Sequence, residues 1–216
     1  MITMNEAILY KIKTGRKCKT EIKENYKRSI RVKVLPKKRY ADVVEKFLLT
    51  DLILLIISLR IYIKSMKVLI IMGSQTDENV MQESSKWLTW FGIGHDMVVA
   101  SAHRNPDKVR ELMVNAQSNG YGVVIAAAGM AAALPGVCSA YTSLPVLGVP
   151  LDGGLPGGID ALYSIVQMPP GLPVGTLAVG KAGAKNAAAL AARIIALSDK
   201  TIAAKVEEFK ANGYKI

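Results

Sequence analysis

The fold of this chain is decided by the segment KVLIIMGSQTD, residues 67–77. Its apolar residues Val68 to Met72 are consecutive rather than alternating, which is typical of a strand buried on both faces of a sheet. A helical pattern then runs from Asp77 to Phe91, with apolar side chains at Val80, Trp87, Leu88 and Phe91. The segment therefore predicts a buried strand that leads directly into an amphipathic helix.

The sequence that follows, up to residue 216, repeats this alternation. Further apolar runs predict strands at residues 97–100, 123–128, 145–149 and 173–179. Helices are predicted from Asn105 and Pro106 to Gly120, over the Ala-rich residues 186–197, and over residues 199–210. Strands that alternate with helices form βαβ units, so we predict an α/β fold for residues 66–216: a three-layer α/β/α sandwich with a parallel sheet.

The loops after the first three strands carry the residues that point to a ligand. In an open parallel sheet, ligands bind outside the carboxyl ends of the strands. The three loops are residues 73–77, 101–106 and 127–136, and each precedes a predicted helix. Helix N-termini attract anions, Gly73 lets a phosphate approach the backbone, and Arg104 adds a forked cation. These features predict a phosphorylated small molecule as the ligand.

Two interpretations are open for the polar side chains of the first loop. Asp77 would repel a phosphate, but its carboxylate can accept hydrogen bonds from sugar hydroxyls. Ser74, Thr76 and Asp77 are equally suited to cap the following helix, a role that needs no ligand. Spacing alone does not separate these two roles.

His103 is the candidate proton carrier, because the chain has only two histidines and an imidazole titrates near neutral pH. We expect the other one, His95, to be a solvated residue in a turn before the second strand. A histidine that caps or packs a loop is the alternative role for His103. Because no second His, Cys pair or acidic cluster stands near it at ligand spacing, no catalytic metal is predicted.

The cysteine content favours a reducing compartment. The chain contains Cys18 and Cys138, too few for a disulfide framework, and we expect the protein to be cytoplasmic. Cys138 follows an Ala-rich stretch, which favours a buried and inert thiol.

Five sequence blocks together resemble the PurE-type N5-carboxyaminoimidazole ribonucleotide mutase family. They are MGSQTD (72–77), SAHRNPD (101–107), AGMAAALPG (128–136), LPVLGVP (144–150) and GIDALYSIVQMPPGLPVGTLAVGKAGAKNAA (158–188). The resemblance covers essentially all of residues 66–216 and none of residues 1–65. It implies a flavodoxin-like fold, a homo-octamer with active sites between subunits, and neither metal nor organic cofactor.

The resemblance also implies the reaction and the roles of the site residues. The carboxylate on the exocyclic nitrogen of the ribonucleotide moves to C4 of the imidazole, a step of purine (IMP) biosynthesis. By similarity, Ser74, Asp77 and Arg104 bind the ribonucleotide, with Ser101 beside them, and His103 is the catalytic proton shuttle. Gly73 and Gly129 supply close backbone approach, and the small residues from Gly129 to Gly136 suit a closed apolar chamber for released carbon dioxide.

Two residues of the third loop depart from the family pattern. Many members have His where this chain has Ala133, and Gly is usual where it has Met130. If the missing imidazole only shapes the pocket, Ala133 changes rate or affinity; if it assists the carboxyl transfer, activity is lower or the substrate differs.

Two other functions are kept as alternatives. The first is a sister enzyme that carboxylates aminoimidazole ribonucleotide directly with carbon dioxide. The second is a non-catalytic flavodoxin-like nucleotide-binding module, for which Tyr141 and Tyr163 are the aromatic candidates to flank a flavin.

Residues 1–65 differ in composition from the rest of the chain. They contain 16 of the 28 Lys and Arg residues but only 6 of the 17 Asp and Glu residues, so no nucleic acid is expected as a partner of residues 66–216. Their apolar stretch, residues 47–63, is shorter than the roughly 20 residues of a membrane span and contains Asp51 and Arg60.

The origin of this N-terminal extension has three interpretations. Met66 directly precedes the first strand, as an initiator methionine would, so we interpret residues 1–65 as an upstream extension from a misplaced start. A peripheral or membrane-associating tail is the second possibility, and a nucleic-acid-binding tail is the third. The mass of the native N-terminus distinguishes the first from the others.

Overall fold

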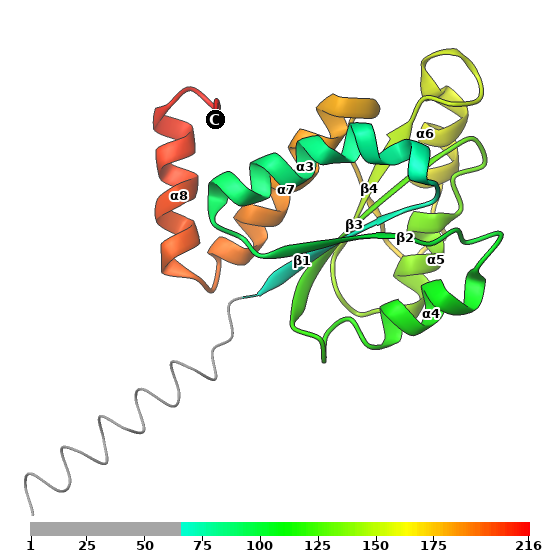
Figure 1. Cartoon of the computed structure of the whole chain (residues 1–216), viewed down its shortest axis with the longest axis horizontal. Helices are drawn as coiled ribbons and strands as arrows, with labels where there is room; N and C mark the ends of the chain where they lie inside the picture. The colour runs from blue at the N-terminus through cyan, green and yellow to red at the C-terminus, as the bar shows by residue number, and fades with distance from the viewer. Residues whose placement is uncertain (1–65) are drawn as a thin grey trace, which may run out of the picture. The chain divides into compact units, whose positions relative to one another are not determined.

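The computed structural model describes residues 66–216, and the expectations for residues 1–65 lie outside the described residues. The described chain forms five parallel strands: β1 (Lys67–Met72), β2 (His95–Val99), β3 (Tyr121–Gly129), β4 (Val146–Leu151) and β5 (Gly175–Thr176). Their order in the sheet is β2-β1-β3-β4-β5, which is the flavodoxin-like order. The predicted parallel sheet is thus confirmed (Figure 1).

Helices cover both faces of this sheet. One layer contains α3 (Glu78–Phe91), α7 (Gly180–Ala196) and α8 (Lys200–Ala211), and the other contains α4 (Pro106–Val114), α5 (Leu134–Tyr141) and α6 (Ile159–Val166). Two short 3-10 turns, η2 (Gln75–Asp77) and η3 (Pro156–Gly158), precede α3 and α6. The three-layer α/β/α sandwich predicted from the sequence is confirmed.

The two hydrophobic cores are separated by the sheet because strand residues alternate between its faces. Val68, Ile70 and Met72 of β1 pack with the α3 and α7 side, whereas Leu69 and Ile71 pack with the α4 and α5 side. Each of these side chains is almost fully buried, and burial of such a side chain stabilises the fold by about 1.5–3 kcal/mol. Both faces of β1 are therefore apolar, as its consecutive apolar residues predicted.

Small residues let α7 pack closely against α3. Ala184, Ala187, Ala188 and Ala191 are fully buried, and the Ser84 hydroxyl of α3 donates to the Ala184 carbonyl oxygen at 2.7 Å. A Cβ at Gly183 would clash with the Ala178 carbonyl oxygen, so glycine is required there. The Ala-rich pattern of α7 is explained by this close contact.

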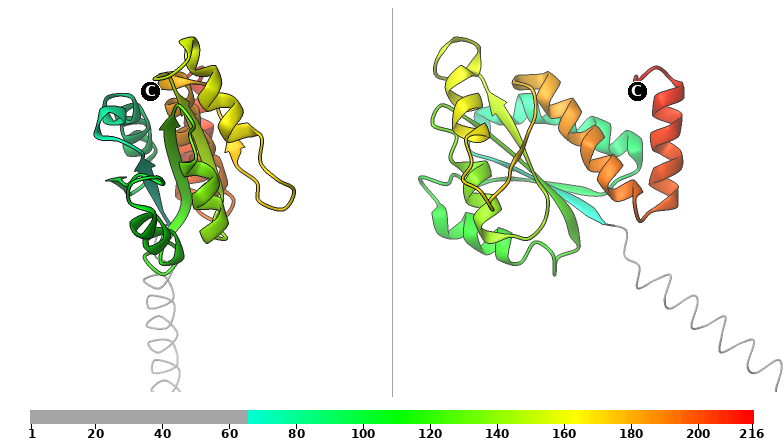
Figure 2. Two further views of the ribbon diagram at one scale, coloured as in Figure 1. Left: turned by 90° about the vertical axis from the view of Figure 1, so that its right-hand side faces the viewer. Right: turned by 180° about the vertical axis from the view of Figure 1, so that it is seen from behind.

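The C-terminal helix α8 extends the first layer at the end of α7, away from α6 (Figure 2). Its Phe209 ring lies 5.2 Å, between ring centroids, from both Trp87 and Phe91 of α3 in edge-to-face geometry. Asp199 caps the helix, since its carboxylate accepts hydrogen bonds from Thr201 N and Ile202 N. The predicted amphipathic C-terminal helix is confirmed.

Several boundaries differ from the sequence-based expectation. The fifth strand was expected over residues 173–179 but pairs only at Gly175 and Thr176. Helix α4 ends at Val114 rather than Gly120, and a series of turns fills the interval. His95 is the first residue of β2 rather than a solvated turn residue: it pairs with Val68 of β1, and its side chain is half-buried beside Ser85 of α3.

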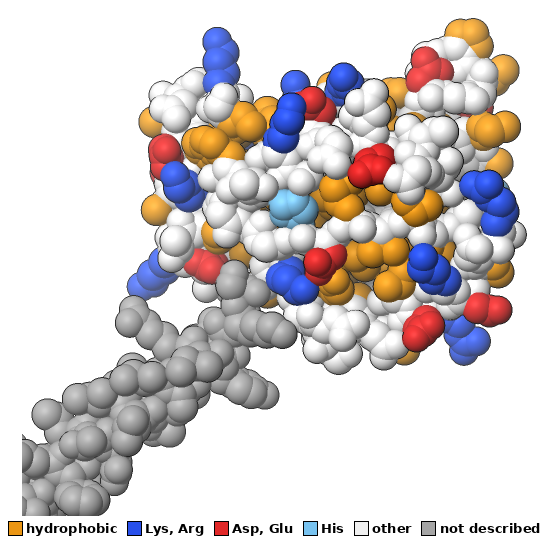
Figure 3. Space-filling view, viewed as in Figure 1, with side chains coloured by type: hydrophobic (Ala, Val, Ile, Leu, Met, Phe, Trp, Pro, Cys, Tyr) orange, Lys and Arg blue, Asp and Glu red, His pale blue; other side chains and the backbone are white. Residues whose placement is uncertain are grey.

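The surface of residues 66–216 carries charges of both signs. Figure 3 shows Lys and Arg side chains interspersed with Asp and Glu over the visible face, as the near balance of charges in this part of the sequence predicts. None of the helices described here combines the length and the apolar character needed to cross a membrane.

Candidate active site

A pocket of about 710 Å³ lies at the carboxyl ends of β1, β2, β3 and β4. It is formed beside the point where the strand order reverses between β1 and β3, which is where ligands bind in open α/β sheets. Its volume is within the roughly 300–1,000 Å³ of small-molecule sites. All seven residues predicted for the site line it: Gly73, Ser74, Asp77, Ser101, His103, Arg104 and Gly129.

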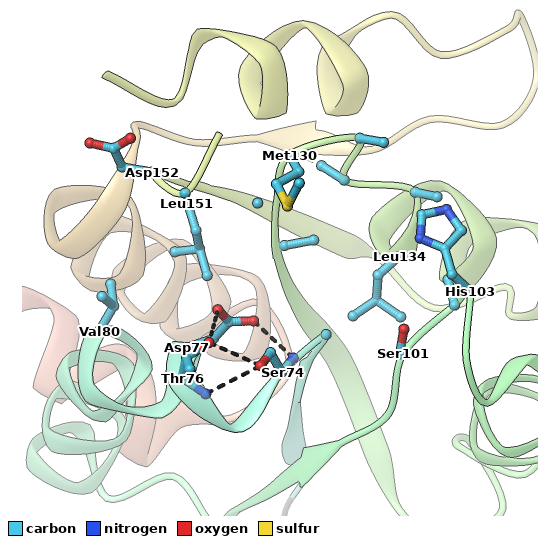
Figure 4. Close-up of a pocket in the computed structure, with 18 of the residues that line it drawn as sticks. Ser74, Thr76, Asp77, Val80, Ser101, His103, Met130, Leu134, Leu151 and Asp152 are labelled. Atoms are coloured by element: carbon cyan, nitrogen blue, oxygen red, sulfur yellow. Dashed lines mark hydrogen bonds between the residues drawn. The ribbon is translucent and has the colours of Figure 1, made fainter. Parts of the chain in front are cut away.

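The first loop is held by a reciprocal set of hydrogen bonds around Ser74 (Figure 4). Ser74 N donates to Asp77 Oδ2 at 3.0 Å, while Ser74 Oγ accepts from Thr76 N at 3.4 Å and from Thr76 Oγ1 at 2.9 Å. Ser74 and Asp77 thus form a capping box on the 3-10 turn η2, whereas Asp77, at the N-cap position of α3, makes no side-chain capping bond to that helix. The same three residues also line the pocket, so capping fixes side chains that a ligand can reach.

Asp77 is a half-buried carboxylate. Burial raises its pKa above the ordinary value of 3.8, and the hydrogen bonds from Ser74 and Thr76 and the positive charge of Arg104 act in the opposite direction. Burial is the largest of these effects. The carboxylate is thus partly desolvated, which strengthens any hydrogen bond that it accepts from a ligand.

The second loop is joined to the first through Arg104. Arg104 Nη2 donates to the Gly73 carbonyl oxygen at 3.3 Å, and Arg104 N donates to Ser101 Oγ at 3.2 Å. Ser101 is itself buried, and its N–H donates to Asn105 Oδ1 at 3.4 Å. Asn105 occupies the N-cap position of α4 as predicted, but its side chain makes no hydrogen bond to the first turn of the helix.

The two histidines have different surroundings. The imidazole of His103 is exposed and lines the pocket, on the opposite side from Asp77 (Figure 4). His95 is half-buried: its Nε2 lies 2.7 Å from Ser85 Oγ, and its Nδ1 lies 3.1 Å from the Ile93 carbonyl oxygen. His95 does not line the pocket, so His103 is the imidazole that a bound ligand would meet.

The third loop contributes an apolar wall. Gly129 ends β3, and residues 130–134 line the pocket before α5 begins. Two non-glycine residues in this loop, Met130 and Ala132, have positive φ angles of 57° and 33°. The Ala132 N–H donates to the Gly129 carbonyl oxygen at 3.0 Å, which fixes the turn.

Sequence reasoning missed the part of the pocket formed by Asp152, Gly153 and Gly180. The first two follow β4, so applying the same strand-end rule to the fourth strand would have found them. Gly180 begins α7 after the short β5, and no local sequence signal places it near the first loop. Tyr141 and Tyr163, the aromatic candidates for a flavin, do not line this pocket.

Metal-binding clusters and the Cys138 thiol are the remaining features that could supply chemistry. Across residues 66–216, no three His, Cys, Asp or Glu side chains are grouped so that they could hold a metal ion. Cys138 is a free thiol buried in α5, and burial raises its pKa to about 12. It is therefore uncharged at neutral pH, as expected for an inert thiol.

Comparison with known proteins gives consistent matches over this part of the chain. A family model described as AIR carboxylase matches residues 67–215. The N5-carboxyaminoimidazole ribonucleotide mutase of Haemophilus influenzae is 49% identical over 149 residues, which are 69% of this chain and 91% of that protein. The mutases of Vibrio vulnificus and Escherichia coli K12 are 52% and 49% identical over 67% of this chain, covering 90% and 85% of those proteins.

The fold has a match among solved structures. The crystal structure of Treponema denticola PurE superposes with a TM-score of 0.62 at 29% sequence identity. The match covers 68% of this chain and 90% of that structure.

Proposed function

The chain belongs to the AIR carboxylase family, and from this membership we infer that it is an isomerase of purine biosynthesis that carries out the N5-carboxyaminoimidazole ribonucleotide mutase reaction. The observation that carries the inference is the identity of about half of the aligned residues to curated mutases over 85–91% of their lengths. The product is 4-carboxy-5-aminoimidazole ribonucleotide.

The proposed ribonucleotide site combines the first two loops. Arg104 has five N–H donors and uses one on Gly73, so the others are available for a phosphate beside the N-terminus of α4. Asp77 accepts hydrogen bonds from ribose hydroxyls, and Ser74 and Ser101 complete the polar wall. The hydrogen bond from Arg104 to the first loop supports this joint role, because it holds both loops in one arrangement.

His103 is proposed as the proton shuttle. It protonates the exocyclic nitrogen as the bond from that nitrogen to the carboxylate carbon breaks and carbon dioxide is released. C4 then forms a bond to carbon dioxide, and His103 takes the proton that leaves C4. The position of His103 suits this exchange, because its exposed imidazole lines the pocket and can reach a bound ligand.

The third loop is proposed as the chamber that keeps carbon dioxide near C4. Its wall consists of Gly129, Met130, three alanines and Leu134, and none of these side chains carries a charged or hydrogen-bonding group. Ala133, the N-cap residue of α5, lines the same wall, so the start of this helix is the proposed binding point for a carboxylate.

A homo-octamer with active sites between subunits is proposed for the assembly. Support comes from a stripe of apolar side chains on and just before α6, composed of Leu155, Ile159, Tyr163 and Val166, which are 38–60% exposed. Apolar residues spaced in this way along one helix face favour contact with another protein surface.

The free thiol of Cys138 fits the cytoplasmic location proposed for the chain.

The test of the catalytic role is the variant His103→Ala. We expect kcat to fall by roughly 10²- to 10⁴-fold, because the proton carrier is lost, while calorimetry still detects ribonucleotide binding of similar affinity. His95→Asn is the matched control, since His95 does not line the pocket, and it should retain near-normal turnover. Near-normal turnover by His103→Ala would show that the proton shuttle has been assigned wrongly.

The carboxylase alternative is kept because the matching family model carries that description. It is distinguished by supplying each substrate separately to the purified protein. Turnover of the N-carboxylated ribonucleotide without dependence on added bicarbonate is expected. Turnover of aminoimidazole ribonucleotide with bicarbonate, and none of the N-carboxylated form, would assign the chain to the carboxylase class instead.

A further inference from the structure

The fourth loop of the pocket, residues 152–158, connects β4 to α6 and is rich in glycine. Four of its seven residues are glycine, and Gly157 and Gly158 have positive φ angles of 76° and 65°. Asp152 and Gly153 of this loop line the pocket. Because glycine has more backbone freedom to lose than any other residue, such a loop needs specific contacts to keep one conformation.

Asp160, in the first turn of α6, supplies one such contact. Its Oδ2 accepts a hydrogen bond from the Leu155 N–H at 3.1 Å, and the Leu155 carbonyl oxygen accepts one from the Gly158 N–H at 3.0 Å. The other oxygen of the half-buried Asp160 carboxylate, Oδ1, is buried and has no hydrogen-bond partner among residues 66–216. A buried acceptor without a donor lowers the stability of a fold, so the carboxylate is better explained by the loop that Oδ2 holds.

Gly154 shows how closely the loop is wrapped around this carboxylate. A Cβ on Gly154 would clash with Asp160 Oδ2, so the backbone of the loop passes directly beside that oxygen. A Cβ on Gly158 would lie 3.2 Å from the Leu151 carbonyl oxygen and 3.3 Å from the Cα atom of Asp152, so the end of the loop returns to its beginning. The contact with Asp160 and this close return together restrain the part of the loop that lines the pocket.

The restrained part of the loop lies on the side of the pocket proposed for the ribose. Figure 4 shows Asp152 and Leu151 on the same side as Asp77, with His103 opposite. Asp77 is proposed to bind ribose hydroxyls, and His103 is proposed to move the proton. A change in the loop should therefore affect how tightly the ribonucleotide binds more than how fast the proton moves.

We propose that Asp160 is a positioning residue whose carboxylate holds the fourth loop in the conformation that accepts the ribonucleotide. This inference rests on the mutase function proposed above. Without the contact, only a fraction of the molecules has the binding conformation at a given time. The apparent affinity falls in proportion to that fraction, whereas kcat, which is measured at saturating substrate, stays the same.

Steady-state kinetics of three variants tests the proposal. Asp160→Ala removes the carboxylate, and Gly154→Ala displaces it by a clash without backbone strain, because Gly154 has no positive φ angle. We expect both to raise KM for the N-carboxylated ribonucleotide by roughly tenfold or more and to change kcat by less than about threefold. Asp160→Asn should keep KM within about threefold of the wild-type value, because its amide oxygen can accept the hydrogen bond from Leu155.

A control variant and a double variant separate positioning from a general loss of stability. Asp199→Ala removes a carboxylate that accepts backbone hydrogen bonds at the start of α8 and does not line the pocket, so it should lower the unfolding temperature and leave KM unchanged. Partial unfolding lowers the measured kcat by reducing the amount of active protein, but it does not raise KM. The double variant Gly154→Ala/Asp160→Ala should have no higher KM than either single variant, because both changes remove the same contact.

The outcomes distinguish failure of this inference from failure of the proposed function. Wild-type protein that forms no product would overturn the mutase function and, with it, the role of Asp160. Wild-type turnover with an unchanged KM in Asp160→Ala and Gly154→Ala, or with an equal rise of KM in Asp160→Asn, would overturn the positioning role while leaving the function intact. A smaller particle in light scattering for Asp160→Ala would assign its effect to the subunit contact proposed along α6, and it would also overturn the proposal.

Discussion

At the scale of single residues, Ala133 carries no imidazole, so the described pocket is lined by one histidine, His103. Ala133 occupies the N-cap position of α5 and lines the pocket, and its methyl group cannot donate or accept a hydrogen bond. His103 of the second loop is the one histidine among the residues that line the described pocket, so the proposed proton transfer would depend on it. The residues of the third loop that line the pocket carry no titrating side chain.

Replacement of Ala133 by histidine tests whether a second imidazole helps. We expect Ala133→His to leave kcat unchanged or to raise it several-fold, because the half-buried position borders the pocket and an imidazole there can donate a hydrogen bond to the moving carboxylate. Steady-state kinetics measures the effect, with Ala140→His as the control, since Ala140 is an exposed residue of α5 that does not line this pocket. A fall in kcat of more than tenfold in a folded Ala133→His protein would contradict this expectation.

At the scale of elements, one polar cluster joins the amino-terminal ends of three strands. Asp96 Oδ2 of β2 accepts hydrogen bonds from Tyr121 of β3 at 2.6 Å and from Lys67 of β1 at 2.7 Å. These bonds lower the pKa of Asp96, the bond from Lys67 having the larger effect. Burial, and then the bond to Asp96, raise the pKa of Tyr121 to about 12. The cluster lies at the opposite end of the sheet from the pocket.

The variant Tyr121→Phe should therefore weaken the fold without affecting catalysis. We expect the free energy of unfolding to fall by about 1 kcal/mol at pH 8, a value that allows for the partial exposure of the cluster. In the folded protein the pKa of Tyr121 is above its ordinary value of 10.0. The difference in free energy of unfolding between the wild type and Tyr121→Phe should therefore be complete below pH 10 and disappear between about pH 10 and 12. Urea denaturation at a series of pH values measures this. If the free energy of unfolding of both proteins depends on pH in the same way, the hydrogen bond from Tyr121 to Asp96 does not stabilise the fold.

At the scale of the whole molecule, the exposed apolar stripe of α6 is the surface proposed for contact between subunits. Leu155 and Tyr163 are 57% and 60% exposed, although both are large apolar side chains. The stripe follows the loop after β4, part of which lines the pocket. Contact between subunits along α6 would therefore act on the same loop that borders the proposed ribonucleotide site.

A charge placed in this stripe should dissociate the assembly. We expect wild-type protein to have the mass of an octamer in light scattering and Tyr163→Glu to form smaller particles with lower kcat/KM, because burying a carboxylate in an apolar contact is costly. Leu197→Glu is the matched control, since Leu197 is 89% exposed at the end of α7. An octamer that survives Tyr163→Glu would place the subunit contact elsewhere.

The sequence by itself determined the layers of the fold and most of the candidate site. Consecutive apolar residues such as Val68–Met72 require cover on both faces of a strand, because each side chain must leave water whichever way it points. The alternation of such runs with helices then requires a parallel sheet, and the carboxyl ends of its strands must share one edge. This reasoning found Ser74, His103 and Arg104 before any contact between them was known.

Only the tertiary structure decided the strand order and its consequences. The periodicity of apolar residues predicts which side chains are buried but not which strands are neighbours. It therefore could not predict that β1 lies between β2 and β3 or that Arg104 contacts Gly73. It could not shorten β5 to two residues or bring Gly180 into the pocket, because those features depend on contacts between segments far apart in the chain. The same reason hid the positive φ angle of Met130, since backbone conformation in a loop is set by the elements that it connects.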